Sequence, residues 1–492
     1  MKRKIYQKLV GWKSAGAVKP LMVIGARQVG KTYIIEEFAR QEYHNYLEFN
    51  LKDRKDVAQL FDAPINTQDK IDQLEYIVGS AIDFESTLLF FDEAQESEGL
   101  IEALKFFAEA PQRYQIICAG SLLGVKLKRF RGSFPVGKVK ILRMYPMDFE
   151  EYLDACGESR LSRLIRDCLQ GSRKMSEPVH EKCLNLYRRY LCVGGMPEAV
   201  ANLLENNNEV LRFDRSILDD ITQSYLADMT KHIKNMAEAS RIESIYRSIP
   251  SQLGNRSRKF QFSKVKEGIK SRDYHSALSW LTASEMVYAC TAVETPMVPL
   301  KGFVKPEVFK LYLNDPGLLG NLVGIRYPDI MLDNSFTYKG ILTENYVAGQ
   351  LASAGIPLLY WRDEHNAEID FLIQTASGVI PIEAKSGRNK ASASLRRYQD
   401  NYNPAWVIRL MARNFGFVNQ VRTVPLYAAF AFSDLVDLNV DPSFDPNLDP
   451  NVDPNVGVNS NLSSSSNPGS SSGSNPEEDD APLANAPIDL ER

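Results

Sequence analysis

Short apolar runs alternate with helix-like segments along roughly the first 155 residues of the chain. Four runs have the length of buried strands, at residues 21–25, 46–51, 87–93 and 114–121. The segments KTYIIEEFAR (31–40) and LIEALKFFAEA (100–110) carry the spacing of amphipathic helices. Because strands that alternate with helices favour a parallel sheet covered by helices, we expect an α/β fold in this part of the chain.

The pattern changes after residue 155. A mostly helical stretch runs to about residue 250, and the part from 256 to 313 predicts two helices followed by two strands. Helix and strands alternate again from about residue 340 to 432. We therefore expect five segments, with the boundaries 1–155 (α/β), 156–250 (helical), 251–325 (helices and two strands), 335–432 (α/β) and 433–492 (tail).

The tail has a composition of its own. Asp-Pro recurs every four residues from Asp441, and Ser, Gly and Asn then dominate. Such a sequence cannot bury a core, so we expect 433–492 to be disordered. The formal net charge of the chain is −4, but the tail holds 12 acids and one base, which leaves a body of 57 bases and 50 acids with a charge of +7. A mildly basic body permits contact with nucleic acid without requiring it.

Other features of the composition exclude several classes of protein. The six cysteines are scattered without a C-x-x-C pair, which favours a reducing compartment and argues against a zinc site. The basic segment after Met1 lacks the apolar core of a signal peptide. No stretch approaches the roughly 18 apolar residues of a membrane span. We therefore expect a cytoplasmic protein with no membrane partner.

The sequence GARQVGKT, from Gly25 to Thr32, has the pattern G-x-x-x-x-G-K-T of a phosphate-binding loop. It follows the first predicted strand directly and opens the first predicted helix, as this motif requires. The two glycines let backbone N–H groups approach a phosphate, Lys31 reaches the β- and γ-phosphates, and the Thr32 hydroxyl binds Mg²⁺. A glycine turn with a surface lysine is the alternative. The motif predicts that ATP and Mg²⁺ are bound by Gly25, Ala26, Arg27, Gln28, Val29, Gly30, Lys31, Thr32 and Tyr33.

Two acids and a serine follow later strands of the same predicted sheet. Asp92 and Glu93 end the apolar run LLFF, at the carboxyl edge where open α/β sheets bind their ligands. We expect Asp92 to hold Mg²⁺ and Glu93 to polarise the attacking water. Ser121 ends the next strand, where it is either a sensor of the γ-phosphate or an ordinary turn residue.

These motifs, together with SFPVGKVKILRMYPMDFEEYL and YLCVGGMPEAV, resemble a bacterial and archaeal family of AAA-type P-loop ATPases fused to a C-terminal region of unknown function. The resemblance covers about residues 1–432. It implies that Asp92 and Glu93 form the Walker B pair, that Ser121 is the first sensor, and that residues 156–250 form a helical lid. In that lid the sequence GGMP would place Pro197 near the base of the nucleotide. An arginine finger is not identifiable, although Arg131 and Arg143 lie in a plausible region.

The segment from Arg256 to Arg272 carries seven bases and one acid. Helices followed by two strands resemble a winged helix, and the family resemblance implies one here. The bases then predict contacts with a phosphate backbone, whereas a solvated face or a winged helix that packs domains together is the alternative. The residues proposed for backbone contact are Lys264, Lys266, Lys270 and Arg272.

A second acidic pattern lies near the C-terminus. Glu344 lies in a predicted helix, and AEIDFLIQTASGVIPIEAKSG then carries Asp370, Glu383 and Lys385 on two predicted strands joined by a turn at Ser377-Gly378. The order E…D…E-x-K resembles a restriction-endonuclease-like core. Carboxylate oxygens suit Mg²⁺, which would activate water for phosphodiester cleavage, and residues two apart in a strand share a face.

The pattern therefore predicts metal ligands at Glu344, Asp370 and Glu383, with Asp370, Glu383 and Lys385 as catalytic residues. A surface hairpin that happens to carry charge is the structural alternative.

Three functions remain open from the sequence. The first is an ATP-driven enzyme that couples nucleotide state to a C-terminal domain acting on or binding DNA or RNA. The second is a nucleotide-dependent switch or scaffold for protein partners, with a catalytically silent C-terminal fold. The third is a nuclease whose phosphate-binding loop only stabilises the fold. The chain could also act as a homo-oligomer, because a neighbour's arginine completes the site in many AAA-type ATPases.

Overall fold

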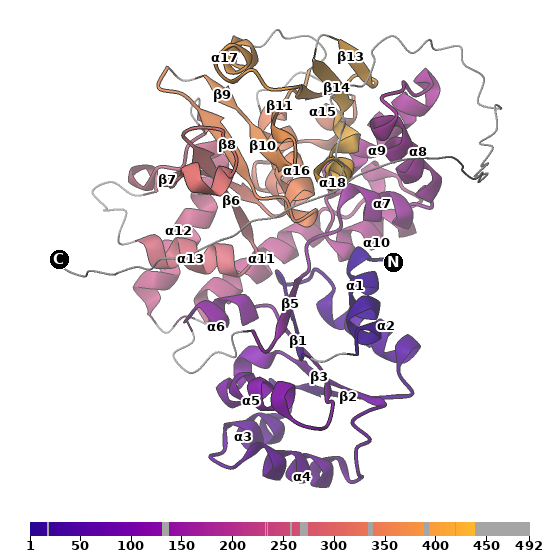
Figure 1. Cartoon of the computed structure of the whole chain (residues 1–492), viewed down its shortest axis with the longest axis vertical. Coiled ribbons are helices and arrows are strands. Elements are labelled where there is room, and N and C mark those ends of the chain that lie inside the picture. Colours follow the sequence, from indigo (N-terminus) through magenta and orange to yellow (C-terminus); the bar gives the residue numbers. More distant parts are fainter. Residues whose placement is uncertain are drawn as a thin grey trace, which may run out of the picture. The chain divides into compact units, whose positions relative to one another are not determined.

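The computed structural model of the protein describes residues 1–16, 19–129, 137–231, 233, 235–255, 258–265, 274–332, 338–365, 367–387, 393–418 and 420–437. The N-terminal strands are β1 (Leu21–Ile24), β2 (Asn45–Asn50), β3 (Thr87–Asp92), β4 (Gln115–Gly120) and β5 (Lys140–Arg143). They form one parallel sheet in the order β2-β3-β4-β1-β5 (Figure 1). This confirms the predicted α/β fold and the four predicted strands. The sequence did not predict β5, because this edge strand is mostly exposed and lacks an apolar run.

Both faces of this sheet are buried. In β1, Leu21 and Val23 belong to one apolar cluster, while Met22 and Ile24 belong to another. Successive side chains of a strand point to opposite faces, so a strand covered on both sides reads as an unbroken apolar run. The N-terminal helices are α1 (Lys4–Ser14), α2 (Lys31–Glu42), α3 (Lys55–Asp62), α4 (Thr67–Val78), α5 (Glu98–Glu109) and α6 (Leu123–Arg129).

Local capping sets where several of these helices begin and end. Asn66 accepts a hydrogen bond from the backbone N–H of Asp69 at the start of α4, and Ser97 does the same for Leu100 at the start of α5. Helix α4 ends at Gly79, which takes the left-handed conformation that suits glycine.

The next part of the chain is helical, as the sequence predicts. Its helices are α7 (Phe149–Ala155), α8 (Ser159–Gln170), α9 (Glu177–Val193), α10 (Pro197–Glu205), α11 (Ser216–Lys231) and α12 (Met236–Leu253). A capping box starts α7, in which Asp148 and Glu151 bind each other's backbone N–H groups.

The central part contains α13 (His275–Ala283), β6 (Val287–Val293), β7 (Val304–Leu313), α14 (Pro316–Leu322) and α15 (Tyr327–Met331). Strands β6 and β7 are antiparallel, as expected of a wing. However, β6 also pairs in parallel with β8 (Leu359–Arg362), and β8 pairs with β9 (Glu368–Ile369). The expected two-stranded wing is therefore part of a four-stranded sheet, β7-β6-β8-β9, shared with the C-terminal part.

The C-terminal part begins with α16 (Lys339–Ser353). Strands β10 (Phe371–Thr375) and β11 (Gly378–Ala384) form the predicted hairpin, and α17 (Ala393–Tyr402) follows it. Their sheet has the order β10-β11-β12-β14-β13 and is completed by β12 (Val407–Met411), β13 (Gly416–Val418) and β14 (Val421–Pro425). The short helix η6 (Leu426–Phe432) then leads into α18 (Ser433–Asp437).

The structure moves the start of the predicted tail. Residues 433–437 form α18, where Leu435 is buried and Asp434 pairs with Arg166, so the expectation of disorder from residue 433 is wrong for these five residues. Residues 438–492 lie outside the described residues. All of the described residues, α18 included, belong to one unit, Met1–Pro442, which leaves the boundaries near 155, 250 and 325–335 as predictions.

Candidate functional site

The loop from Gly25 to Thr32 connects β1 to α2 at the carboxyl edge of the N-terminal sheet. A Cβ on Gly25 would lie 2.2 Å from the carbonyl oxygen of Met144, so the backbone directly after β5 leaves no room for a side chain there. Gly30, with a φ of 90°, takes the left-handed conformation and starts α2. A glycine-containing loop that leads into the N-terminus of a helix, as this one leads into α2, suits an anion.

Lys31 lies inside this loop. Its side chain is buried, and its Nζ donates hydrogen bonds to the carbonyl oxygens of Gly25 (3.0 Å) and Ala26 (2.8 Å). Burial lowers the pKa of Lys31 to about 8, against the opposing effect of the negative charges of Glu93 and Asp92. A lysine held in this way supplies positive charge at the place where a phosphate would bind.

Thr32 and Asp92 meet across the loop and β3. The Thr32 hydroxyl donates to the Asp92 carboxylate over 2.8 Å. Burial raises the pKa of Asp92, although the Thr32 hydrogen bond opposes this effect. A hydroxyl and a carboxylate oxygen are ligands that Mg²⁺ accepts, so these two residues fit the metal of a bound nucleotide.

Glu93 follows β3 in a left-handed backbone conformation, with a φ of 49°. Its carboxylate accepts a hydrogen bond of 2.5 Å from the side chain of Gln95, a contact that the sequence did not predict. A Cβ on Gly120 would lie 1.9 Å from the same Gln95 side chain, so a larger residue at the end of β4 would displace the Gln95 amide. Ser121 comes next and is partly exposed at the same edge of the sheet.

The other predicted loop residues differ in burial and in their contacts. Ala26 and Val29 are buried and can offer only their backbone to a ligand, while Tyr33 is 56% exposed. Arg27 and Gln28 instead contact helix α11. The Arg27 guanidinium lies 2.6 Å from the Asp228 carboxylate, and the Ser224 hydroxyl donates to the Gln28 side chain over 3.1 Å.

Two further parts of the chain reach the loop. Pro197 lies close enough that a Cβ on Gly30 would be 3.6 Å from its ring, so the structure places this predicted residue against the loop. Arg3 was not predicted. It donates to the carbonyl oxygens of Val29 (2.8 Å) and Tyr145 (2.6 Å), and it lies 3.2 Å from the Glu151 carboxylate. A lone arginine near the N-terminus carries no sequence signal for such a role.

Of the two arginines considered as fingers, Arg143 pairs with Glu285 over 3.0 Å, on the same chain. Arg131 lies outside the described residues.

Family models match three parts of the chain. Residues 17–153 match an AAA domain, residues 184–329 match a domain of unknown function (DUF8612), and residues 339–429 match another (DUF4143). The chain contains an AAA-type P-loop domain. Its match to this class of ATPase supports ATP binding and hydrolysis.

Solved structures give looser likenesses. A Walker-type ATPase of Pyrococcus abyssi is 15% identical over 65% of this chain and 95% of its own, with a TM-score of 0.40. The ORC2 protein of Aeropyrum pernix is 14% identical over 67% and 92%, with a TM-score of 0.33. The RuvB branch migration motor of Thermotoga maritima is 14% identical over 60% and 90%, with a TM-score of 0.26. Likenesses this distant carry no argument about function. Comparison with curated proteins finds no match.

The C-terminal acids lie apart from the AAA domain in sequence, on the hairpin β10–β11 and on α16. The register that pairs Phe371 with Ile382 places Asp370 opposite Glu383. Asp370 accepts a hydrogen bond of 2.9 Å from the backbone N–H of Ala384. Lys385 lies two residues beyond Glu383, and its Nζ is 2.8 Å from the Glu383 carboxylate. The hairpin thus brings three of the four predicted residues together.

The fourth residue, Glu344, is engaged by other parts of the chain. It pairs with Arg258 and accepts a hydrogen bond of 3.2 Å from the Tyr312 hydroxyl. Within the described residues, the oxygens of Glu344, Asp370 and Glu383 do not form a group within 4.8 Å of one another. As arranged, these three carboxylates do not form a shared cation site, and the metal site predicted there stays a prediction.

The basic segment lies largely outside the described residues, which include Lys264 at the end of η3 (Phe262–Lys264) but not Lys266, Lys270 or Arg272. In the part of the chain that the structure describes, no helix is long and apolar enough to cross a membrane.

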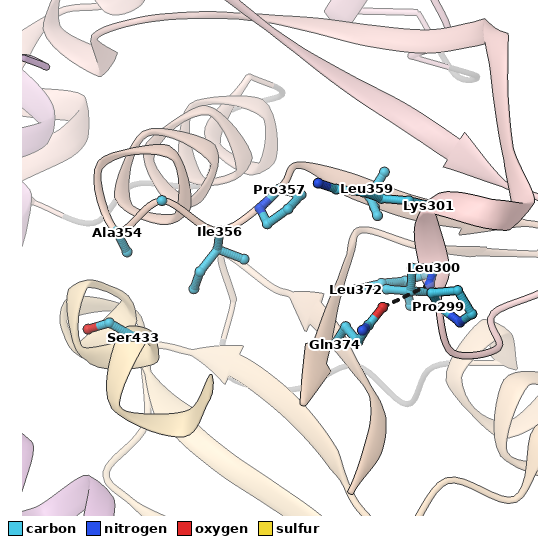
Figure 2. Close-up of a pocket in the computed structure, with 11 residues that line it drawn as sticks. Pro299, Leu300, Lys301, Ala354, Ile356, Pro357, Leu359, Leu372, Gln374 and Ser433 are labelled. Atoms are coloured by element: carbon cyan, nitrogen blue, oxygen red, sulfur yellow. Dashed lines mark hydrogen bonds between the residues drawn. The ribbon is translucent and has the colours of Figure 1, made fainter. Parts of the chain in front are cut away.

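A pocket of about 400 Å³ lies in the C-terminal part, away from every predicted site residue. Figure 2 shows that the segment from Pro299 to Lys301 lines it on one side and the segment from Ala354 to Pro357 on another. Its lining is mainly apolar. Gln374 is turned toward Leu300 and accepts a hydrogen bond of 2.8 Å from its backbone N–H.

Proposed function

We propose that the protein binds ATP with Mg²⁺ and hydrolyses it at the AAA domain. The observation that carries the proposal is the 2.8 Å hydrogen bond between Thr32 and Asp92. Thr32 follows the lysine of the motif, and Asp92 ends β3. In P-loop ATPases a hydroxyl and a carboxylate at these two positions hold the metal of the bound nucleotide. Lys31, buried in the same loop, supports this assignment.

Each residue has a distinct part in the proposed reaction. Backbone N–H groups of the loop and the start of α2 bind the β- and γ-phosphates, and Lys31 offsets their charge. Thr32 and Asp92 would hold Mg²⁺, which neutralises charge on the transferred phosphoryl group when it is bound. Glu93 orients the attacking water and accepts its proton. Ser121, which follows the neighbouring strand β4, would contact the γ-phosphate.

Substitution of Lys31 tests the nucleotide site. We expect Lys31→Ala to abolish ATP binding and hydrolysis, because the phosphates lose their buried counter-charge. The matched control is Lys55→Ala, since Lys55 forms a surface pair with Glu96. Binding of a fluorescent ATP analogue and release of phosphate should both stay near the wild-type level in the control. Normal ATP turnover by Lys31→Ala would show that the site is assigned wrongly.

We further propose that the nucleotide state of the AAA domain governs a nuclease-like C-terminal core that acts on or binds nucleic acid. The placement of Asp370 opposite Glu383, with Lys385 two residues on, supports this proposal. Its alternative is a catalytically silent fold that recruits protein partners. The free state of the cysteines agrees with a reducing, cytoplasmic setting for either.

A cleavage assay separates these two possibilities. Single- and double-stranded DNA and RNA are incubated with Mg²⁺ or Mn²⁺, with and without ATP, using wild type and Asp370→Ala. Product that disappears in the variant supports the nuclease. Capture of a protein partner in one nucleotide state only, without any cleavage, supports the silent fold.

A further inference from the structure

Glu344 is an acid of the predicted metal site, yet the structure surrounds it with donors from the central part of the chain. The side chain is 2% exposed. One oxygen pairs with the guanidinium of Arg258, while the other accepts from the Tyr312 hydroxyl and lies 3.9 Å from the Nζ of Lys310. Both oxygens of the carboxylate are therefore engaged by groups that a divalent cation would have to displace.

Lys310 provides a second internal cation at the same place. It is fully buried on β7, and its Nζ lies 2.5 Å from the carboxylate of Glu368 and 4.8 Å from the centre of the Tyr360 ring. A charge this deeply buried is tolerated only when it is paired. Lys310 is therefore paired closely with Glu368 and lies within reach of the charge of Glu344.

The two cations come from one part of the chain and the acids from another. Arg258 follows α12 and Lys310 lies on β7. Both belong to residues 184–329, which match one domain of unknown function. Glu344 and Glu368 lie on α16 and β9, within the stretch that matches the other. The ion pairs therefore cross between two regions that the family models treat as separate.

We propose that Arg258 and Lys310 act as internal counter-ions that keep the C-terminal acids closed to a divalent cation, so that withdrawal of Arg258 opens the site. This inference rests on the proposed nuclease-like core. It explains why carboxylates of the required type and order do not gather at ligand distance among the described residues.

Arg258 is the residue suited to move. Its side chain is 29% exposed, so the guanidinium can leave Glu344 and be solvated by water. Lys310 has no such route, because it is fully buried and lies between Glu344 and Glu368, so its ammonium cannot reach water as the Arg258 guanidinium can. The structure thus combines one removable cation with one fixed cation.

Strand β7 connects this closed site with the nucleotide site. Leu313 exchanges two backbone hydrogen bonds with the side chain of Asn345, of 2.8 and 3.1 Å. The next residue, Asn314, donates to the Tyr225 hydroxyl over 3.0 Å, and Asp315 accepts from the Gly195 N–H over 2.6 Å. The end of β7 is therefore bonded to α16 on one side, and to α11 and the GGMP loop on the other.

The nucleotide loop contacts the same two elements. Arg27 pairs with Asp228 of α11, and Pro197 of the GGMP loop lies beside Gly30. A movement of α11 or of the GGMP loop on nucleotide binding would displace the end of β7, and with it Tyr312 and Lys310. This gives the AAA domain a contiguous set of contacts through which it can act on Glu344.

The test is Mn²⁺ binding by the full chain without nucleotide, measured from the electron paramagnetic resonance signal of free Mn²⁺. We expect Arg258→Ala to bind Mn²⁺ at least about tenfold more tightly than wild type. The double variant Arg258→Ala/Glu344→Gln should lose this gain. The control is Arg247→Ala, which removes a surface arginine paired with Glu243 on α12 and should behave as wild type.

Equal Mn²⁺ binding by wild type and Arg258→Ala, or no binding by either, would overturn the proposal. Arg258→Gln provides a second variant if the alanine variant does not fold.

Cleavage assays on the same proteins distinguish failure of the closure from failure of the nuclease. A gain of Mn²⁺ binding without cleavage would support the proposed closure and contradict the proposed nuclease. Equal cleavage by wild type and by Arg258→Ala would contradict the closure alone.

Discussion

At the scale of residues, the nucleotide site depends on charge held away from water. Lys31 is buried between backbone carbonyl oxygens with a pKa lowered by that burial, and Asp92 and Glu93 lie close enough to oppose the shift. A bound phosphate would add negative charge beside the ammonium and favour its protonated form. Nucleotide binding should therefore be linked to proton uptake at mildly alkaline pH.

The lowered pKa of Lys31 sets the direction and size of this proton uptake. With a pKa of about 8 in the free protein, Lys31 is about half deprotonated at pH 8 and about one-tenth deprotonated at pH 7. We expect MgADP binding to take up about half a proton at pH 8 and little at pH 7. Calorimetric titrations in buffers of different ionisation enthalpy measure this number.

Lys31→Arg serves as the control, since an arginine side chain stays protonated and removes the uptake. A release of protons at pH 8, or an uptake that persists in Lys31→Arg, would contradict the account.

Some site residues could be predicted from sequence and others could not, for a physical reason. Lys31, Thr32 and Asp92 stand at fixed places next to apolar strands, so local spacing identifies them. Arg3 and Arg258 act on partners that are far away in the sequence, and each stands in a surface-like polar stretch. Their roles depend on tertiary packing, which no local pattern encodes.

At the scale of elements, close contacts at Gly195 hold the GGMP loop against other parts of the chain. A Cβ on Gly195 would lie 1.9 Å from the carbonyl oxygen of Met147 and 2.8 Å from the Tyr190 hydroxyl. The Gly195 N–H also donates to Asp315, whose pKa burial raises to about 6. The sequence GGMP thus owes its glycines to close packing as well as to any contact with a nucleotide.

Alanine substitutions at two glycines should have opposite effects. We expect Gly195→Ala to lower the free energy of unfolding by about 1–3 kcal/mol, because the added methyl group overlaps the backbone of Met147. Gly11→Ala should raise it by about 0.5–1 kcal/mol, since Gly11 lies in α1 with nothing within 4 Å of the added Cβ. Urea unfolding followed by circular dichroism measures both. A Gly195→Ala protein as stable as wild type would show that the loop adjusts freely.

Elements differed in how well the sequence predicted them. Strands β1, β3 and β4 and the hairpin β10–β11 were expected, because continuous apolar runs and a Ser-Gly turn mark them. Strand β2 was also expected, although only one of its residues is buried. The edge strand β5 lacks that signal, and the pairing of β6 with β8 joins residues 291–293 to 359–361, which local patterns do not encode. The sequence therefore predicted a two-stranded wing, whereas in the structure β6 and β7 belong to a four-stranded sheet.

At the scale of the whole molecule, the nucleotide loop of the AAA domain contacts α11 and the GGMP loop, and both are hydrogen-bonded to the residues that follow β7. The segments that surround the nucleotide loop, from α1 to the GGMP loop and α11, come from widely separated parts of the chain. In the proposed function, nucleotide hydrolysis drives movement along these contacts, and hydrolysis with Glu93 as the general base is therefore its central step.

Single-turnover hydrolysis of ATP by Glu93→Gln, compared with wild type, tests this claim most directly. We expect the variant to bind ATP normally and to hydrolyse it about 100-fold or more slowly, because it keeps the phosphate contacts and loses the general base. Glu96→Gln is the matched control, since Glu96 lies three residues away and pairs with Lys55 over 3.4 Å on the surface. Hydrolysis at the wild-type rate by Glu93→Gln, or no hydrolysis by wild type, would contradict the account.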